Sequence, residues 1–227
     1  MIISKGLMML SAKDLAKYFD HTLLDPSATA AQIHLLCSEA KDWGFYSVCV
    51  HPYYLELCKQ ELLGTPVKLC TVVGFPLGQN TVETKIYETK NAIQLGADEI
   101  DMVLNISALK SQRLDYVQKE IESVVNAADN KTVKVIIETA LLNKEQIIKA
   151  THLCENAKAH YVKTSTGFSK RGASLEDIET IVQATSTGIK IKASGGIRNL
   201  EDAQKFINAG VHRLGASKSV DIVKSLI

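Results

Sequence analysis

The sequence has no excess of charge of either sign. Among its 227 residues, 26 lysines and arginines stand against 25 aspartates and glutamates, which gives a net charge of +1. Proteins that bind the nucleic acid backbone depend on an excess of positive charge, so this balance argues against a nucleic acid partner. Any anionic ligand must therefore be bound by a local group of residues.

Cysteine and histidine patterns typical of disulfides or metal sites are also missing. The five cysteines contain no C-x-x-C pair, and the six histidines show neither an H-x-H nor an H-E-x-x-H pattern. An odd cysteine count without such motifs argues against a disulfide framework and against a structural zinc site. We therefore expect a cytoplasmic protein that uses no metal and no other cofactor.

Long apolar runs and linker-like segments are lacking as well. No run approaches the ~20 apolar residues of a membrane span. The apolar N-terminal segment MIISKGLMML is interrupted by Lys5 and carries no cleavage motif of a signal peptide. A hydrophobic content of 46% is enough for a large core, and no Gly/Ser-rich stretch divides the chain. We expect one catalytic domain over residues 1–227, with no membrane contact.

Short apolar segments rich in β-branched residues alternate with amphipathic segments. The predicted strands span residues 19–23, 47–50, 68–73, 99–103, 133–137, 161–164, 189–193 and 213–215. The predicted helices span residues 29–41, 53–62, 82–95, 114–127, 144–155, 175–183, 200–209 and 220–226, and a short N-terminal helix precedes them. Strands that alternate with helices form right-handed parallel βαβ units.

Eight βαβ units in a chain of this length favour a closed barrel. A doubly wound sheet usually has fewer strands and a glycine-rich first turn, whereas Asp25-Pro26-Ser27 follows the first strand here. We therefore predict an α/β fold, a single (β/α)8 TIM barrel. The loops after the strands of such a barrel open onto one face, so functional residues are expected at the C-terminal strand ends.

Two lysines occupy neighbouring strand ends. Lys163 lies in Tyr-Val-Lys-Thr-Ser-Thr-Gly, and Lys192 lies in Ile-Lys-Ile-Lys-Ala-Ser-Gly-Gly. An ordinary lysine has a pKa of ~10.4 and is protonated at neutral pH, but burial and a second cation both favour the neutral amine. A neutral amine can attack a carbonyl group and form a Schiff base. In the alternative reading, the lysines extend toward the barrel mouth or pair structurally with Asp20 or Asp101.

Three more charged residues lie in otherwise apolar strands. Asp101 needs a buried partner, a lysine or an ordered water, and serves either as a proton acceptor beside the nucleophile or only as an ion-pair partner. Asp20 in the first strand is expected to have a supporting role. Lys190 shares the period-two phase of Lys192, so we expect it to point inward or to lie just below the strand. Glu99 is its expected structural partner near the bottom of the barrel.

Small-residue turns follow the last three strands, and their residues are Thr166-Gly167, Ser194-Gly195-Gly196 and Gly215-Ala216-Ser217. Glycine allows backbone N–H groups to approach an anion closely, and barrels frequently bind phosphate after strands seven and eight. Each turn alone could serve only local geometry. Because the three turns belong to one sector of the barrel, they favour a phosphate site.

Six motifs together resemble one enzyme family. They are Phe-Asp-His-Thr-Leu-Leu at 19–24, Val-Val-Gly-Phe-Pro-Leu-Gly at 72–78, Gly-Ala-Asp-Glu-Ile-Asp-Met-Val at 96–103, Val-Ile-Ile-Glu-Thr at 135–139, Val-Lys-Thr-Ser-Thr-Gly-Phe at 162–168 and Lys-Ala-Ser-Gly-Gly-Ile-Arg at 192–198. In order, spacing and strand position the set resembles the deoxyribose-phosphate aldolases, from about residue 11 to the end of the chain.

The resemblance implies a metal-free class I aldolase, a lyase. Such an enzyme reversibly splits 2-deoxy-D-ribose 5-phosphate into D-glyceraldehyde 3-phosphate and acetaldehyde. Lys163 would form the Schiff base, and Lys192 would lower the pKa of Lys163 and assist proton transfer. Asp101 would act with Lys192 as proton donor and acceptor, and Asp20 would help to hold Lys192. The implied phosphate-binding residues are Gly167, Gly195, Gly196, Gly215 and Ser217.

Two other functions stay open. Another Schiff-base aldolase that acts on a different sugar phosphate would share the lysines and the glycine turns, and a non-catalytic sugar-phosphate-binding barrel would need the turns alone. Under each reading the partner is a small sugar phosphate. An aldolase would also bind an aldehyde as a second small-molecule partner. The resemblance is also compatible with a homodimer, although no surface stripe in the sequence identifies an interface.

Overall fold

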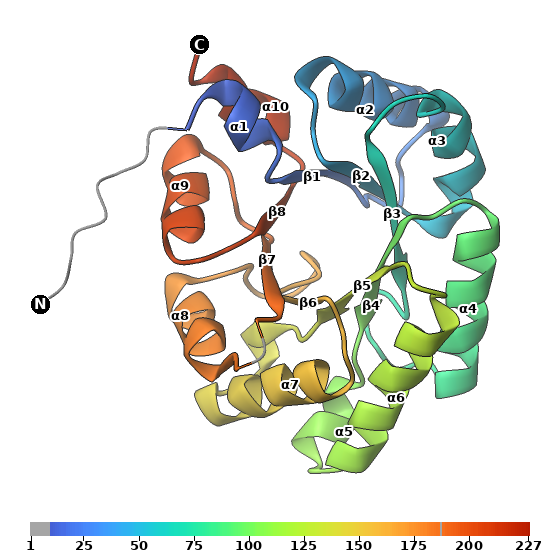
Figure 1. The fold of residues 1–227 in the computed structure, drawn as a ribbon, viewed down its shortest axis with the longest axis vertical. Helices are drawn as coiled ribbons and strands as arrows, with labels where there is room; N and C mark the ends of the chain where they lie inside the picture. Colours follow the sequence, from blue (N-terminus) through green and yellow to red (C-terminus); the bar gives the residue numbers. More distant parts are fainter. Residues whose placement is uncertain (1–9, 187) are drawn as a thin grey trace, which may run out of the picture.

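A computed structural model describes residues 10–186 and 188–227, and eight parallel strands close into one barrel in it (Figure 1). The strands follow the order of the chain around the barrel, β1 through β8, and β8 pairs with β1. They are β1 (Phe19–Leu23), β2 (Ser47–Val50), β3 (Lys68–Val73), β4 (Glu99–Val103), β5 (Thr132–Ile136), β6 (Tyr161–Lys163), β7 (Lys190–Ser194) and β8 (Arg213–Ala216).

Helices surround the barrel. They are α1 (Ala12–Ala16), α2 (Ala30–Trp43), α3 (Leu55–Glu61), α4 (Val82–Gln94), α5 (Ile106–Lys110), α6 (Leu114–Ala127), α7 (Lys144–Asn156), α8 (Leu175–Ala184), α9 (Leu200–Asn208) and α10 (Ser219–Lys224), with 3-10 turns η1 (Pro52–Tyr54) and η2 (Thr139–Leu141). Within the described ranges, no helix is both long and apolar enough to cross a membrane.

The (β/α)8 barrel predicted from the sequence is confirmed, and so is the short helix before β1. The predicted bounds of β1 to β4 agree with the structure, and those of β5 to β8 differ by one residue at one or both ends. Two details were not predicted. The segment after β4 forms the short helix α5, which Asn105 caps by accepting a hydrogen bond from the N–H of Ala108 at 2.9 Å, and α3 begins only after the turn η1.

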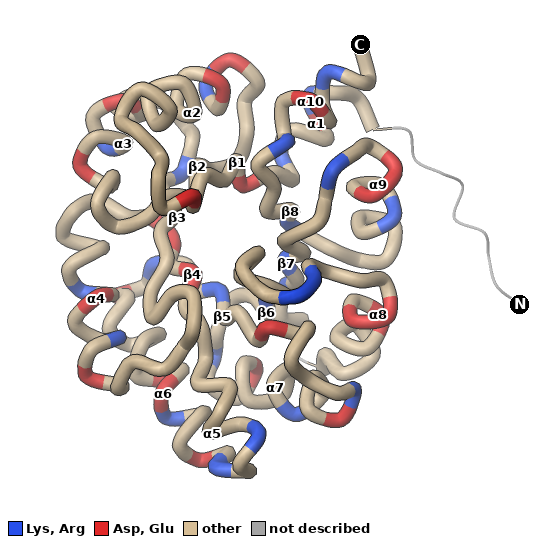
Figure 2. The backbone as a smooth tube through the Cα atoms, turned by 180° about the vertical axis from the view of Figure 1, so that it is seen from behind, with Lys and Arg blue, Asp and Glu red and all other residues tan. Residues whose placement is uncertain are grey.

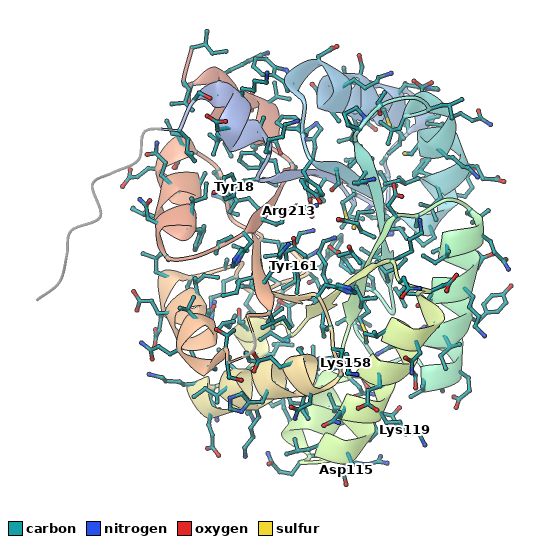
Figure 3. The ribbon with its side chains drawn as sticks, viewed as in Figure 1. Tyr18, Asp115, Lys119, Lys158, Tyr161 and Arg213 are labelled. Atoms are coloured by element: carbon teal, nitrogen blue, oxygen red, sulfur yellow. The ribbon has the colours of Figure 1, made fainter. Side chains whose placement is uncertain are left out.

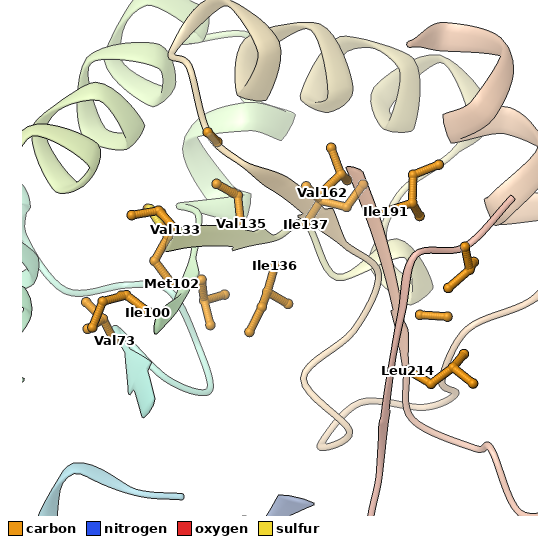
Figure 4. Close-up of a cluster of buried hydrophobic side chains, with 14 of the residues drawn as sticks. Val73, Ile100, Met102, Val133, Val135, Ile136, Ile137, Val162, Ile191 and Leu214 are labelled. Carbon is orange, nitrogen blue, oxygen red and sulfur yellow. The ribbon is translucent and has the colours of Figure 1, made fainter. Parts of the chain in front are cut away.

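The two faces of the barrel sheet have different compositions. Residues that point outward toward the helices are apolar, and Figure 4 shows several of them, among them Ile100, Met102 and Val162. The inward positions of the same strands carry charged side chains, including Asp101 on β4 and Lys163 on β6, and both are buried. Because side chains alternate along a strand, one strand supplies both the hydrophobic core and the polar interior.

Candidate active site

One carboxylate, that of Asp101, connects three lysines inside the barrel. Its Oδ2 accepts hydrogen bonds from Lys163 Nζ at 2.8 Å and from Lys192 Nζ at 2.7 Å. Its Oδ1 accepts from Lys134 Nζ at 2.7 Å. Lys163 and Lys192 are register partners on β6 and β7, so the two amines meet the same oxygen from adjacent strands. Figure 2 shows the barrel from behind, with acidic positions on β4 and basic positions on β5 to β7.

A second layer of charge lies around Asp20 and Glu99. Asp20 pairs with Lys192 through Oδ2, and its Oδ1 accepts from Arg213 Nε at 2.8 Å. Glu99 Oε2 forms an ion pair with Lys134 Nζ at 2.7 Å and accepts a hydrogen bond from Arg213 Nη2 at 2.9 Å. Three carboxylates and four cationic groups therefore form one buried cluster, whose members are Asp20, Glu99, Asp101, Lys134, Lys163, Lys192 and Arg213.

The cluster favours the ionised forms of several members. Burial alone would raise the pKa of Asp101, but Lys134, Lys163 and Lys192 hold it well below its usual range. Burial alone would lower the pKa of Lys192, but Asp101 and Asp20 raise it above the ordinary value. Asp101 and Lys192 thus stabilise each other's charge, which fixes both side chains beside Lys163.

One group of potential metal ligands lies at the cluster, but a lysine side chain already contacts it. Ligand atoms of Cys49, Cys70 and Asp101 lie within 4.8 Å of one another. Lys134 Nζ, however, lies 3.3 Å from the sulfur of Cys70 and 2.7 Å from Asp101 Oδ1. Burial also raises the pKa of the Cys70 thiol, and a thiol must lose its proton to bind a metal. The ammonium group of Lys134 therefore stands where a cation would have to sit.

A cavity of about 680 Å³ opens above Lys163. Residues from the end of β1 and from the loops after β1, β6, β7 and β8 line it, among them Thr22, Thr166, Phe168, Arg198 and Lys218. The five residues expected to bind phosphate also line it, and they are Gly167, Gly195, Gly196, Gly215 and Ser217. The structure thus brings the glycine turns and Lys163 to one cavity, while Asp101, Lys192 and Asp20 lie buried in the barrel interior.

Two of the loops touch through glycines. A Cβ on Gly172 would lie 2.0 Å from the carbonyl oxygen of Gly195, so the loops after β6 and β7 can approach only without side chains. Gly195 and Gly196 also have φ values of +78° and +79°, which favour glycine. These turns therefore line the cavity with backbone instead of side chains.

The loop after β6 is tied to β5 by a buried carboxylate. Glu138 Oε2 accepts hydrogen bonds from the N–H of Thr166, at 3.1 Å, and from its hydroxyl. The Thr166 Oγ1 in turn accepts from the N–H of Phe168 at 3.1 Å. Phe168 meets Phe75 from the loop after β3 edge to face, with ring centroids 5.3 Å apart. These contacts position one wall of the cavity.

Some parts of this site were not found in the sequence. Lys134, Arg213 and Ser47 were not singled out. Ser47 belongs to the site because its hydroxyl donates to Asp20 Oδ1 at 2.7 Å. Lys134 and Arg213 show the same signal that marked Asp101, a charged residue in an apolar strand. The expected pairing of Lys190 with Glu99 is wrong. Lys190 is exposed, with Nζ 5.7 Å from the ring of Tyr161, because Arg213 and Lys134 already occupy Glu99.

Comparison with known proteins gives the same family for nearly the whole chain. The DeoC/LacD family aldolase model matches residues 15–220. A deoxyribose-phosphate aldolase of Ureaplasma urealyticum is 52% identical over 92% of this chain and 97% of its own, and one of Clostridium kluyveri is 53% identical over 94% and 99%. The solved tetrameric deoxyribose phosphate aldolase from Aeropyrum pernix superposes with a TM-score of 0.89 at 34% identity, over 95% of this chain and 92% of that one. The chain therefore belongs to the DeoC/LacD family of aldolases.

Proposed function

We propose that this aldolase reversibly cleaves 2-deoxy-D-ribose 5-phosphate to D-glyceraldehyde 3-phosphate and acetaldehyde, with Lys163 as the Schiff-base residue. The observation that carries the proposal is the position of Lys163. In the part of the chain that the structure describes, the cluster has four cationic members, and Lys163 alone among them also lines the cavity. The choice of substrate rests on the names of the relatives, which are deoxyribose-phosphate aldolases. The glycine turns are the proposed binding site for its phosphate.

Lys163 must be a neutral amine when it attacks the substrate. With every member ionised, four positive charges face three negative charges. Loss of one proton from Lys163 leaves equal numbers of each sign. The free amine attacks C1 of the open-chain substrate, and the hydroxyl of the resulting carbinolamine leaves as water to give a protonated imine.

The protonated imine then accepts the electrons of the C2–C3 bond. The C3 hydroxyl loses its proton as this bond breaks, C3 becomes the aldehyde carbon of D-glyceraldehyde 3-phosphate, and an enamine remains on Lys163. Protonation of C2 and hydrolysis of the imine release acetaldehyde. Asp101 and Lys192 are proposed to exchange these protons, directly or through water, and Asp20 is proposed to hold Lys192.

The phosphate is proposed to bind in the sector formed by the loops after β6, β7 and β8. Gly167, Gly195, Gly196 and Gly215 contribute backbone to this sector, and Ser217 adds a hydroxyl. Backbone N–H groups in such turns form concave sites that suit anions. The phosphate would thereby orient the substrate with its reacting carbon toward Lys163.

The decisive experiment is borohydride trapping with 2-deoxy-D-ribose 5-phosphate, followed by peptide mapping. Reduction of the imine should leave the label on the peptide that carries Lys163 and none on Lys192. Ketose phosphates tested in parallel identify an aldolase of different specificity if they are trapped or cleaved faster. An unlabelled Lys163 under saturating substrate would overturn the mechanism.

Two further expectations from the sequence analysis remain predictions, a homodimer and a cytoplasmic location. The relative from Aeropyrum pernix is described as a tetramer, so assembly differs from the expected dimer in at least one relative. Size-exclusion chromatography with light scattering measures the assembly state of this chain directly.

A further inference from the structure

The end of the barrel opposite the candidate active site is hollowed by two adjoining cavities. Their volumes are about 570 and 690 Å³, and Tyr46, Tyr161 and Lys190 line both. Figure 3 shows Tyr18, Tyr161 and Arg213 around the barrel opening on this side, where all three line the larger cavity. The proposed aldolase reaction uses none of this surface.

Three nitrogen-bearing side chains form a row along the cavities. His160 directly precedes β6, Lys190 begins β7, and His212 directly precedes β8. The row is held in register because the N–H of Lys190 donates to the carbonyl of His160 at 3.1 Å and the N–H of His212 donates to the carbonyl of Ile191 at 2.9 Å. All three side chains are exposed. Neighbouring strands thus present one basic group each, ~5 Å apart along the row.

The hydrogen bonds of the two histidines fix which nitrogen carries the proton. Nδ1 of His160 accepts from the N–H of Val133 at 3.1 Å, and Nδ1 of His212 accepts from the N–H of Ile191 at 3.2 Å. A neutral imidazole has one donor and one acceptor nitrogen, so Nε2 of each ring must carry the hydrogen. The row therefore offers two N–H donors on either side of an ammonium group.

Two acidic residues line the two cavities, and both are engaged. Glu99 pairs with Lys134 and Arg213 in the barrel interior, and Glu155 accepts hydrogen bonds from the N–H and hydroxyl of Ser186 at 2.8 and 3.1 Å. Lys17 and Lys158 add positive charge at the flanks of the two cavities. Burial first, and then the charge of Lys190, lower the pKa of His160 and of His212. Among the described residues that line the two cavities, four cationic side chains (Lys17, Lys158, Lys190 and Arg213) therefore outnumber the two carboxylates.

We propose that the N-terminal end of the barrel holds a second anion site, at which His160, Lys190 and His212 bind a phosphoryl group, free or as an ester. Phosphate oxygens accept hydrogen bonds and carry the negative charge that the row lacks. The ring of Tyr46, 39% exposed at the edge of both cavities, provides a face on which an organic part of an ester can pack. This site is independent of the proposed aldolase activity.

The test must separate this site from phosphate bound near Lys163. Side-chain ¹⁵N signals of the histidines, assigned with His160→Gln and His212→Gln, are followed while inorganic phosphate is added to the full chain. We expect the signals of His160 and His212 to shift together and to saturate. Lys190→Met should weaken the binding seen at these signals by about tenfold, the effect of losing one charge-assisted hydrogen bond.

Lys68→Met is the matched control, because Lys68 is the exposed first residue of β3 and lines neither cavity. It should leave the affinity unchanged. Adenosine 5′-monophosphate, used as a second probe, should shift the same signals. The proposal would be overturned if the signals of His160 and His212 did not move at tens of millimolar phosphate. It would also be overturned if wild type and Lys190→Met responded equally. Both outcomes can be read whether or not the chain cleaves deoxyribose 5-phosphate.

Discussion

The amine of Lys163 donates a hydrogen bond to the carboxylate of Asp101 over 2.8 Å, across the interior of the barrel from β6 to β4. The same oxygen of Asp101 accepts from Lys192 at 2.7 Å. Asp101 therefore holds the proposed nucleophile and neutralises the cationic groups around it. These two roles can be separated by experiment.

Asp101→Asn should lower kcat by about 10²- to 10⁴-fold, the range expected when a positioned proton acceptor is lost. It should also lower the free energy of unfolding by about 3–5 kcal/mol, because three buried lysines lose their common counter-charge. Steady-state kinetics at a temperature where circular dichroism shows a folded protein measure the first effect, and urea denaturation measures the second.

The double variant Asp101→Asn with Lys134→Met is the control for charge. It removes one charge of each sign from the cluster, so part of the lost stability should return while turnover stays low. A single Asp101→Asn variant that keeps wild-type turnover would show that Asp101 only balances charge.

Asp20 should make stability depend on pH. Burial alone would raise its pKa, but Arg213, Lys192 and Lys134 lower it below the ordinary value. A carboxylate with a lower pKa in the folded state stabilises the fold above its unfolded pKa of about 3.9, and this contribution is lost as the pH falls further. Urea midpoints of wild type should therefore decline steeply below pH about 4, and those of Asp20→Asn less steeply. Parallel declines in the two proteins would contradict this.

Gly172→Ala should act on phosphate binding. Its Cβ would lie 2.0 Å from the carbonyl oxygen of Gly195, so the loops after β6 and β7 must move apart. We expect KM for 2-deoxy-D-ribose 5-phosphate to rise by about tenfold, which is roughly the effect of losing one charge-assisted hydrogen bond. KM for unphosphorylated 2-deoxyribose should change little. Gly64→Ala is the control for backbone strain away from the site, since Gly64 has a φ of +77° and lines no part of the cavity, and it should leave both KM values unchanged. An equal rise in KM for both substrates would contradict a phosphate-specific effect.

Lys85 on α4 is expected to matter for stability rather than catalysis. It is fully buried and donates to the carbonyls of Gly78 and Val103, at 2.9 and 2.7 Å, and to Glu120 at 2.7 Å. Lys85→Met leaves the Glu120 carboxylate buried without its cation, so unfolding should become easier by about 3–5 kcal/mol.

Lys90→Met, at an exposed position of the same helix, should change the unfolding free energy by less than about 0.5 kcal/mol. Urea denaturation checks both variants. Equal stability of the Lys85 and Lys90 variants would rule out a stabilising role for the buried pair.

Charged residues in apolar strands were the most informative part of the sequence. The alternation of strand and helix, and the phase of Asp101, Lys163 and Lys192, followed from local periodicity alone. The helix α5 and the turn η1 were missed because they are short and depend on caps and on the start of the next helix. Lys134 and Arg213 carried the same signal as the predicted residues but had no motif of their own to assign them a role.

The sequence by itself determined the barrel, the direction in which the strand-end residues point, and the sector in which the glycine turns lie. Only the tertiary structure decided the partners, because strand order and register set which side chains meet across the interior. Register places Lys163 beside Lys192, and barrel closure brings Asp101 from β4 to both. The same closure pairs Glu99 with Arg213 and Lys134. Lys190 therefore remains at the N-terminal end of the barrel, between His160 and His212.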